Sequence, residues 1–395
     1  MFFSRRGADG GLIAVLLFMI GSLYYLQTLR SQMYHNLEKA MKAISTPATP
    51  LNTTYLPSAR AAAAELKKHF YAPSSGLMKN QDPKSDGILW WESANELTAL
   101  TNLAIVDPSY KPTAKKFLHT AFTKARGLKG ASNFKNDYYD DEGWWAMLWI
   151  AAYDLTKEDK YLKIAEDIFD DMANGWESLC GGGIWWDKAR TYVASISNEI
   201  FFKVASQLAN RAPRNEEGRS RYLHWALREW HWFSTKIHIS NQGNEMDGIN
   251  KAGCTDNKRV FSYNQGVILG GLIELEEATR NGTLIQRAHT IANAAIDHLT
   301  IDGILAERDP KTDAQFKGIF VRNLMKLQFI SPKDKYMTFL TQNADSVLKS
   351  DFKEGMIGPH WQGPYRKATA QSQGSGLDLL VAAAAVSFLP NYNTH

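Results

Sequence analysis

Hydrophobic positions recur along most of the chain with the spacing of amphipathic helices, and Gly, Pro, Asn and Asp interrupt them at intervals. Alternation of the strand type is nearly absent. The pattern predicts twelve helices, near residues 58–71, 90–106, 111–126, 140–155, 158–175, 192–210, 217–236, 262–279, 284–300, 314–328, 334–350 and 374–388. The connections before the odd-numbered helices are short, whereas those before the even-numbered helices are long and rich in Gly, Trp, Asp and Asn. Because short connections make antiparallel neighbours, the helices are expected to pair as hairpins.

The even-numbered helices are the more apolar set. The fourth contains GWWAMLWIAAYDL and the eighth YNQGVILGGLIEL, whereas the fifth contains YLKIAEDIFDDM. A helix that is apolar on all sides is buried, which predicts an all-α fold, an (α/α)6 toroid of six helical hairpins, as one domain over residues 58–390. No strict repeat motif supports the alternative, an α-solenoid. All the long connections enter inner helices at their N-termini, so we expect an active site on the face that they share.

The N-terminus has the pattern of a targeting segment. Residues 10–26 carry no charge, and Arg5 and Arg6 precede them. Their length is at the short end of the roughly 17–25 residues that span a bilayer and exceeds the about 7–15 residues of a signal-peptide core. We therefore interpret residues 1–27 as a signal anchor, with a signal peptide as the alternative, and residues 28–57 as a stalk or linker. The leading arginines would stay cytoplasmic, so the rest of the chain is expected in the secretory pathway, as a single-pass membrane-anchored protein with a lumenal or extracellular domain, or secreted.

Two Asn-x-Thr sequons agree with that route and make Asn52 and Asn281 candidate glycosylation sites. An oxidising compartment also makes a disulfide between Cys180 and Cys254 plausible. Two buried free thiols explain the sequence equally well, because spacing alone does not fix geometry.

Composition narrows the classes of function. The net charge of +4 is spread without basic runs, so no nucleic-acid partner is expected. Two cysteines and ten scattered histidines lack metal-ligand spacing, and no phosphate-binding loop or Gly-x-Ser-x-Gly motif is present, so neither a catalytic metal nor a cofactor is predicted. The chain has 12 Trp, 16 Tyr and 18 Phe, many of them beside Asp and Gly, as in proteins that bind the flat apolar faces of sugars.

The strongest candidate for chemistry is the acidic cluster of Asp137, Asp140, Asp141 and Glu142, which opens the most apolar inner helix between pairs of Tyr and Trp. N-capping is the main alternative, and it explains one or two of these acids. Glycoside hydrolysis needs two carboxyl groups across the scissile bond, about 5–5.5 Å apart in retaining enzymes. The adjacent pair Asp140 and Asp141 fits that shorter separation. Two close carboxyl groups also push their pKa values apart, which leaves one of them protonated near neutral pH.

Polar and aromatic residues of the long connections are candidates for sugar binding, although capping within the loops is the alternative for each of them. The candidates are Asn136, Asp137, Tyr139, Trp185, Trp186, Asp187, Asn198, Tyr263, Asn264, Gln265, Phe316, Lys317 and Arg322. Of the two adjacent tryptophans, one is expected to be a core residue.

Several of these segments together resemble a known family. YYDDEGWWAMLWIAAYDLT, GGGIWWD, ISNEIFF, FSYNQGVILGGL and FKGIFVRNL occur in this order, and they are similar to glycoside hydrolase family 76, the endo-α-1,6-mannanase family, especially its fungal members. The resemblance implies an (α/α)6 toroid and retaining cleavage of α-1,6-mannan backbones. It also implies that Asp140 is the nucleophile and Asp141 the general acid/base.

The leading hypothesis is thus a retaining endo-α-1,6-mannosidase that acts through a covalent mannosyl-aspartate intermediate. The first alternative is transfer of that intermediate to another sugar, because some fungal relatives are thought to be transglycosidases of cell-wall assembly. Those relatives often carry a C-terminal lipid-anchor signal, whereas this chain ends LPNYNTH. A catalytically silent mannan-binding wall protein and a sugar epimerase on the same toroid are further alternatives; the long connections contain few of the histidines that such epimerases use.

Overall fold

The computed structural model of the 395-residue chain describes residues 52–80, 86–177, 179–211, 216–237, 240, 242–307 and 313–389. These residues contain twelve α-helices: α2 (Asn52–Phe70), α3 (Trp91–Val106), α4 (Lys111–Lys124), α5 (Tyr139–Thr156), α6 (Asp159–Ala173), α7 (Ser195–Arg211), α8 (Glu216–Lys236), α9 (Ser262–Thr279), α10 (Thr283–His298), α11 (Phe316–Ile330), α12 (Asp334–Ser350) and α13 (Ala370–Val386). Each predicted helix corresponds to one of them.

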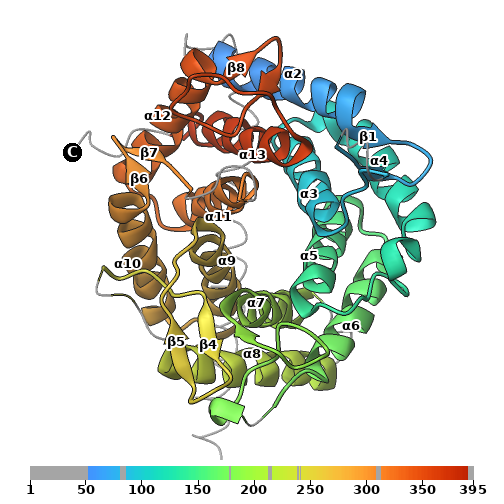
Figure 1. The fold of residues 1–395 in the computed structure, drawn as a ribbon, viewed down its shortest axis with the longest axis vertical. Coiled ribbons are helices and arrows are strands. Elements are labelled where there is room, and N and C mark those ends of the chain that lie inside the picture. Colours follow the sequence, from blue (N-terminus) through green and yellow to red (C-terminus); the bar gives the residue numbers. More distant parts are fainter. Residues whose placement is uncertain are drawn as a thin grey trace, which may run out of the picture.

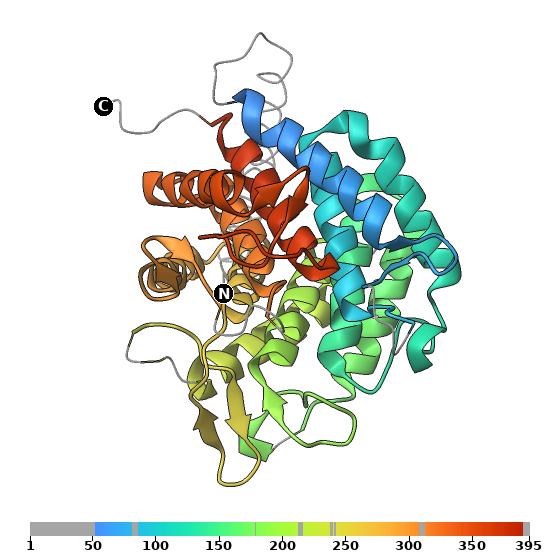
Figure 2. The same cartoon turned by 45° about the horizontal axis from the view of Figure 1, so that its top comes forward.

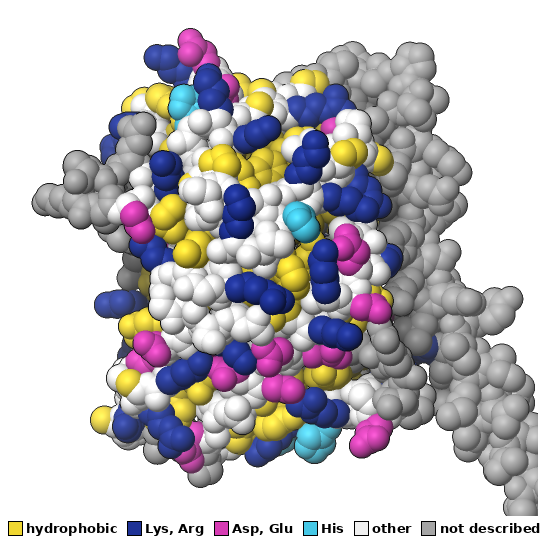
Figure 3. Space-filling model, turned by 90° about the vertical axis from the view of Figure 1, so that its right-hand side faces the viewer, with side chains coloured by type: hydrophobic (Ala, Val, Ile, Leu, Met, Phe, Trp, Pro, Cys, Tyr) yellow, Lys and Arg dark blue, Asp and Glu magenta, His cyan; other side chains and the backbone are white. Residues whose placement is uncertain are grey.

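The helices form two concentric rings (Figure 1). The inner ring consists of α3, α5, α7, α9, α11 and α13; each packs against the next, and α13 packs against α3 to close the circle. Helices α2, α4, α6, α8, α10 and α12 surround them. The inner helices are buried on nearly all sides because their sequences are apolar all round. On the side of the ring in Figure 3, charged side chains of both signs are interspersed over the surface, as is usual for solvent-facing helices.

Short strands and turns, which the helical pattern does not predict, occupy the long connections. The antiparallel pairs are β1 (Tyr71–Ala72) with β2 (Leu77–Met78), β6 (Thr300–Ile301) with β7 (Ile304–Leu305), and β8 (Phe352–Lys353) with β9 (Met356–Ile357). A three-stranded sheet has the order β3 (Val193–Ala194), β4 (Gly248–Asn250) and β5 (Thr255–Asn257). Figure 2 shows the β4–β5 hairpin extending from the helices. Since every long connection leads into an inner helix, the six inner N-termini lie on one face of the ring.

Helices α2 and α13 begin several residues earlier than the sequence predicts. Helix α2 starts at Asn52 and contains Pro57, where the pattern places the end of the linker. Packing overrides the proline, because Tyr55 and Leu56 are buried and the Tyr55 hydroxyl donates a hydrogen bond to Asp345 at 2.6 Å. Helix α13 starts at Ala370 because Thr369 forms a capping box with Ser372.

The predicted targeting segment (residues 1–27) and most of the predicted linker lie outside the described residues. Within the part of the chain that the structure describes, no helix is long and apolar enough to cross a membrane.

An aromatic cluster holds α5 in place behind the site. Phe134 is fully buried, and its ring centroid lies 4.9 Å from those of both Trp145 and Trp149. Trp90, which precedes α3, packs 5.1 Å from Trp145, and Tyr161 of α6 stacks 5.4 Å from Trp149. Each such pair contributes about 0.5–1.5 kcal/mol beyond the buried area. The cluster therefore fixes α5 between its inner-ring neighbour and its outer partner.

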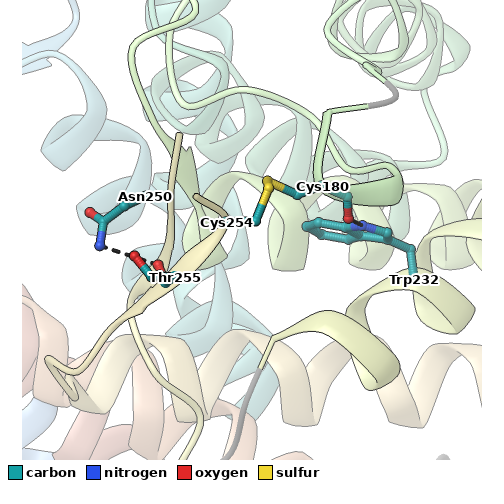
Figure 4. The surroundings of a disulfide bond; sticks show 5 residues. All are labelled: Cys180, Trp232, Asn250, Cys254 and Thr255. Atoms are coloured by element: carbon teal, nitrogen blue, oxygen red, sulfur yellow. Dashed lines mark hydrogen bonds between the residues drawn. A yellow bond between two sulfur atoms is a disulfide. The ribbon is translucent and has the colours of Figure 1, made fainter. Parts of the chain in front are cut away.

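The structure contains the disulfide Cys180–Cys254, which joins the α6–α7 connection to the β4–β5 hairpin (Figure 4). The carbonyl of Cys180 accepts a hydrogen bond from Trp232 Nε1 at 3.2 Å, so this end of the bond is also attached to α8. Since β3 pairs with β4, the two connections are joined by both a sheet and a covalent bond.

Replacing both cysteines with serine is expected to lower the free energy of unfolding by about 2–4 kcal/mol, because the bond restricts a long loop of the unfolded chain. The two cysteines are separated by 74 residues. The melting temperature of the double variant, compared with that of the wild-type protein, tests this expectation. Reduction of the wild-type disulfide should lower the melting temperature to the same value. An unchanged melting temperature in the variant would mean that the β3–β4 pairing alone holds the connections.

Candidate active site

The adjacent aspartates lie in the first turn of the inner helix α5. The N-cap residue of this helix is Tyr138, which has extended backbone and provides no side-chain cap hydrogen bond. Asp140 and Asp141 are half-buried, and Glu142 is fully buried. None of the three acids occupies the N-cap, so capping does not explain the cluster. The free N–H groups of the first turn nevertheless favour negative charge at this point.

A tryptophan from the next connection holds Asp140. Trp186 Nε1 donates a hydrogen bond to Asp140 Oδ2 at 3.0 Å. The other oxygen of the carboxyl group, Oδ1, is buried and accepts no hydrogen bond. Trp186 itself is half-buried, whereas its neighbour Trp185 is 3% exposed and belongs to the hydrophobic core. One oxygen of Asp140 is therefore fixed, and the other remains available for chemistry.

Asn136 has the corresponding role for Asp141. Its Nδ2 donates a hydrogen bond to Asp141 Oδ2 at 2.8 Å. Its Oδ1 accepts a hydrogen bond from the backbone N–H of Tyr138 at 3.0 Å, which fixes the asparagine side chain in a turn before α5. Each carboxyl group of the pair is thus oriented by a different donor.

Burial raises the pKa of both aspartates. The pKa of Asp141 rises to about 6, although the hydrogen bond from Asn136 opposes the rise. The pKa of Asp140 is raised well above its usual range by burial and then by the charge of Asp141, against the hydrogen bond from Trp186. The two groups titrate as a pair, so near neutral pH they hold one proton between them.

The segment that carries Trp186 is tied to the start of α5. The backbone N–H of Tyr139 donates to the carbonyl of Trp186 at 2.9 Å, and that of Lys188 donates to the carbonyl of Asp137 at 2.8 Å. Lys188 Nζ also donates to Glu142 Oε2 at 3.2 Å. Two of the predicted site residues in this segment therefore support the structure: Tyr139 is buried, and Asp137, which is exposed, contributes its carbonyl.

The glycine run before this segment is required by close packing. Gly183 has a φ of +92°, and a Cβ atom there would lie 2.4 Å from the ring of Trp232. Asp187 then closes the turn after Trp186, because its carboxylate accepts hydrogen bonds from the backbone N–H of Thr191 at 2.9 Å and from the Thr191 hydroxyl. Asp187 is 7% exposed, so we assign it to the turn.

Aromatic side chains that are exposed or half-buried stand around the same face of the ring. Tyr138, which is 39% exposed, has its ring centroid 4.9 Å from that of Trp186. Tyr263, at the start of α9, stacks on Phe316, the first residue of α11, with 3.9 Å between centroids. The ring centroid of Trp91 of α3 lies 6.4 Å from that of Phe316. Such rings provide the flat apolar surfaces that the sequence predicts for sugar binding.

Three predicted polar site residues are buried in the ring. The amide of Asn198 donates to the carbonyls of Ile184 and Ala194, and its oxygen accepts from the N–H of Ile184. Gln265 is bound to the backbone of the α8–α9 connection in the same way. These hydrogen bonds occupy both amides, so we assign Asn198 and Gln265 to loop structure. Asn264 is also buried, and its Oδ1 accepts no hydrogen bond.

The two predicted basic residues of α11 likewise point into the protein. Lys317 Nζ donates to the carbonyl of Pro359 at 2.8 Å and lies 4.4 Å from the ring centroid of Trp361. Burial lowers the pKa of Lys317 to about 8. Arg322 is buried and forms an ion pair with Asp378 of α13 at 3.3 Å. Arg322 therefore links α11 to α13.

The sequence did not identify three further acids near the inner N-termini. They are Glu92 in the first turn of α3, Glu199 in α7, and Glu307 before α11. Burial raises the pKa of Glu92 and of Glu307 to about 7 each, and that of Glu199 well above its usual range. An acid in the first turn of an inner helix was the available signal for Glu92, but a first-turn acid is so common that it does not stand out.

Metal-ligating side chains do not cluster within the described ranges: no group of three or more His, Cys, Asp or Glu side chains there is arranged to hold a metal ion.

Comparison with known proteins gives one family. The sequence profile of glycosyl hydrolase family 76 matches residues 55–389. Among curated proteins, the chain is 28% identical over 290 residues to the mannan endo-1,6-alpha-mannosidase DCW1 of Candida glabrata, covering 64% of this chain and 62% of that protein. It is 27% identical over 237 residues to the mannan endo-1,6-alpha-mannosidase DFG5 of Saccharomyces cerevisiae, covering 53% and 51%. The match thus spans less than two thirds of either curated relative.

Solved structures share the fold. An α-1,6-mannanase of Salegentibacter sp. HEL1_6, in an inactive variant with two consecutive aspartates replaced by asparagine and in complex with α-1,6-mannotriose, superimposes with a TM-score of 0.74. The sequence identity is 23%, and the match covers 84% of this chain and 99% of that one.

Proposed function

The chain belongs to glycosyl hydrolase family 76, and on this premise we propose that it is a retaining endo-α-1,6-mannosidase that cleaves α-1,6-mannan backbones. The observation that carries the proposal is the pair Asp140 and Asp141 at an inner-helix N-terminus, with one carboxyl group held by Trp186 and the other by Asn136. Two carboxyl groups that share one proton are the groups that retaining glycoside cleavage needs.

The proposed reaction has two steps. The free oxygen of Asp140 attacks C1 of a mannosyl unit, and Asp141 donates its proton to the departing O6, which leaves a mannosyl ester on Asp140. Asp141, now ionised, then removes a proton from water as the water oxygen attacks C1, and the ester bond to Asp140 breaks. Once the shared proton is on Asp141 in the substrate complex, the hydrogen bond from Trp186 stabilises the charged form of Asp140 before attack and as the ester bond breaks. The pKa of Asp141, about 6, suits a group that gives and takes a proton near neutral pH.

The pH dependence of kcat/KM is expected to be a bell with its acid limb near pH 6. Below that pH the pair binds a second proton and loses its nucleophile, and at higher pH it loses the proton that the leaving oxygen needs. The limb follows from the raised pKa of Asp141, about 6. Initial rates on α-1,6-mannotetraose across the pH range measure it.

The variant Asn136→Ala tests whether the pKa of Asp141 sets the acid limb. The hydrogen bond from Asn136 lowers the pKa of Asp141, so its removal should move the acid limb to higher pH. An acid limb near the ordinary carboxyl range, about 4, in the wild-type protein would contradict the proposed role of the pair.

The function itself is tested by incubating the purified protein with α-1,6-mannan. Mass spectrometry should detect short α-1,6-mannooligosaccharides, and proton NMR at early times should show the α-anomer as the first product. Products of inverted configuration would overturn the retaining mechanism, and unaltered mannan would overturn the activity. An added acceptor oligosaccharide tests the alternative reaction, because transfer yields products longer than the acceptor.

We also propose that the domain resides in the secretory pathway, either anchored by residues 1–27 or secreted. The disulfide supports this location, since such bonds persist in oxidising compartments. Asn281 is exposed in the short connection before α10, where a glycan could be added.

A further inference from the structure

A third carboxyl group, that of Glu92, stands beside the aspartate pair. Glu92 is the second residue of α3, and α3 packs against α5 in the inner ring, with both helices beginning on the same face. The two helix starts are also in contact, because the ring centroids of Trp91, which precedes Glu92, and Trp144, which is three residues after Asp141, lie 6.0 Å apart. Glu92 is half-buried, and the charge that it faces is that of Asp141.

The groups around Glu92 are neutral amides and other acids. The side-chain amide of Gln371, in the first turn of α13, lowers the pKa of Glu92 against the effect of burial, so it lies beside the carboxyl group. Gln371 in turn accepts a hydrogen bond from Asn80 Nδ2 at 2.8 Å, and Gln315 Nε2 donates to the Glu92 carbonyl at 3.1 Å. No Lys, Arg or His forms an ion pair with Glu92 in the ranges that the structure describes. Its other acidic neighbour, Glu96, lies one turn deeper and is fully buried.

A half-buried carboxyl group that has no cation beside it and lies next to a neutral amide is suited to accept hydrogen bonds from a neutral polar ligand. Its position relative to the pair indicates which part of the ligand it meets. Trp186 donates its hydrogen bond to Asp140, the group that attacks C1 of the sugar. Glu92 faces Asp141, the group that delivers a proton to the departing oxygen.

We propose that Glu92 binds the sugar on the leaving-group side of the scissile bond, by accepting hydrogen bonds from its hydroxyl groups. This inference rests on the proposed function and deepens it, since it assigns one residue to the acceptor site next to Asp141. The same contact would position an incoming sugar if the intermediate is transferred to a sugar acceptor.

Two substrates that differ only in the leaving group test the proposal. On α-1,6-mannotetraose, Glu92→Gln in the full-length protein is expected to lower kcat/KM about tenfold, because the amide has one acceptor oxygen where the carboxyl group has two, and hydrogen bonds from the leaving sugar are lost. On the 4-nitrophenyl glycoside of α-1,6-mannobiose, the leaving group is an aryl oxide without hydroxyl groups, and kcat/KM should stay within about twofold of the wild-type value.

The matched control is Glu158→Gln, the same chemical change at an exposed residue that precedes the outer helix α6. It should leave both rates unchanged. An equal loss on both substrates for Glu92→Gln would overturn the proposal, since it would reveal a structural or electrostatic effect on the aspartate pair. The proposal would also be overturned if Glu92→Gln caused no loss of kcat/KM on the tetraose. Failure of the proposed function is distinguishable, because the wild-type protein would then be inactive on both substrates, and the acceptor-site proposal would fall with it.

Discussion

Replacing Asp140 with asparagine is expected to lower kcat on α-1,6-mannan by about 10⁴-fold or more, because an amide oxygen cannot form the mannosyl ester. This corresponds to about 5.4 kcal/mol of transition-state stabilisation. The asparagine oxygen can still accept the hydrogen bond that Trp186 donates to Asp140 Oδ2, so the site should keep its shape. Initial rates with mannan, together with the melting temperature, measure the effect.

The stability of this variant has an expected sign. The pKa of Asp140 is raised in the folded protein, so this carboxyl group opposes folding increasingly as pH rises from its unfolded pKa towards its folded pKa. Asparagine removes that cost, and the melting temperature near neutral pH should not fall. The matched control is Asp297→Asn on the outer helix α10, where the aspartate forms an exposed ion pair with Lys335. Full activity in Asp140→Asn would overturn the assigned chemistry.

The ring could be predicted from the sequence because burial dictates it. The inner helices are apolar all round, and the long connections fall regularly before them. Tertiary packing set one boundary that the pattern missed, and a local cap set the other. Tyr55 and its hydrogen bond to Asp345 extend α2 through Pro57, and the local sequence does not show this contact because Asp345 lies on α12. The capping box of Thr369 and Ser372 starts α13 early, and it is a local signal that hydrophobic periodicity does not include.

The aspartate pair could also be predicted, because four acids among aromatic residues at one helix start form an unusual local pattern. The binding residues were harder to predict for a physical reason. Loops consume polar side chains, and the sequence does not show which carbonyl groups lack partners. Asn198 and Gln265 satisfy such groups, and Arg322 neutralises Asp378. Glu92 was missed because its relation to Asp141 exists only when α3 and α5 are neighbours.

Replacing Asp141 with asparagine is expected to reduce kcat/KM on α-1,6-mannan by about 10²–10⁴-fold, because the departing O6 then leaves without a proton. The loss should be much smaller for release of nitrophenol from the 4-nitrophenyl glycoside, since this leaving group needs no protonation. The pKa of Asp140 should fall in this variant, because the charge of Asp141 raises it in the wild-type protein. Rates on both substrates, and the burst of nitrophenol expected when the ester accumulates, measure these effects.

Azide separates the roles of the two aspartates, because it acts as the nucleophile in both variants but gives products of opposite configuration. In Asp141→Asn, azide attacks the mannosyl ester on Asp140 without needing a base, and two successive inversions give the α-mannosyl azide. In Asp140→Asn, azide attacks the substrate itself while Asp141 protonates the leaving oxygen, and one inversion gives the β-mannosyl azide. The reverse pairing of products and variants would exchange the two roles. In the free site, burial and the charge of Asp141 favour the shared proton on Asp140. The assignment therefore requires that binding of the substrate moves the proton to Asp141, the group that faces the departing oxygen.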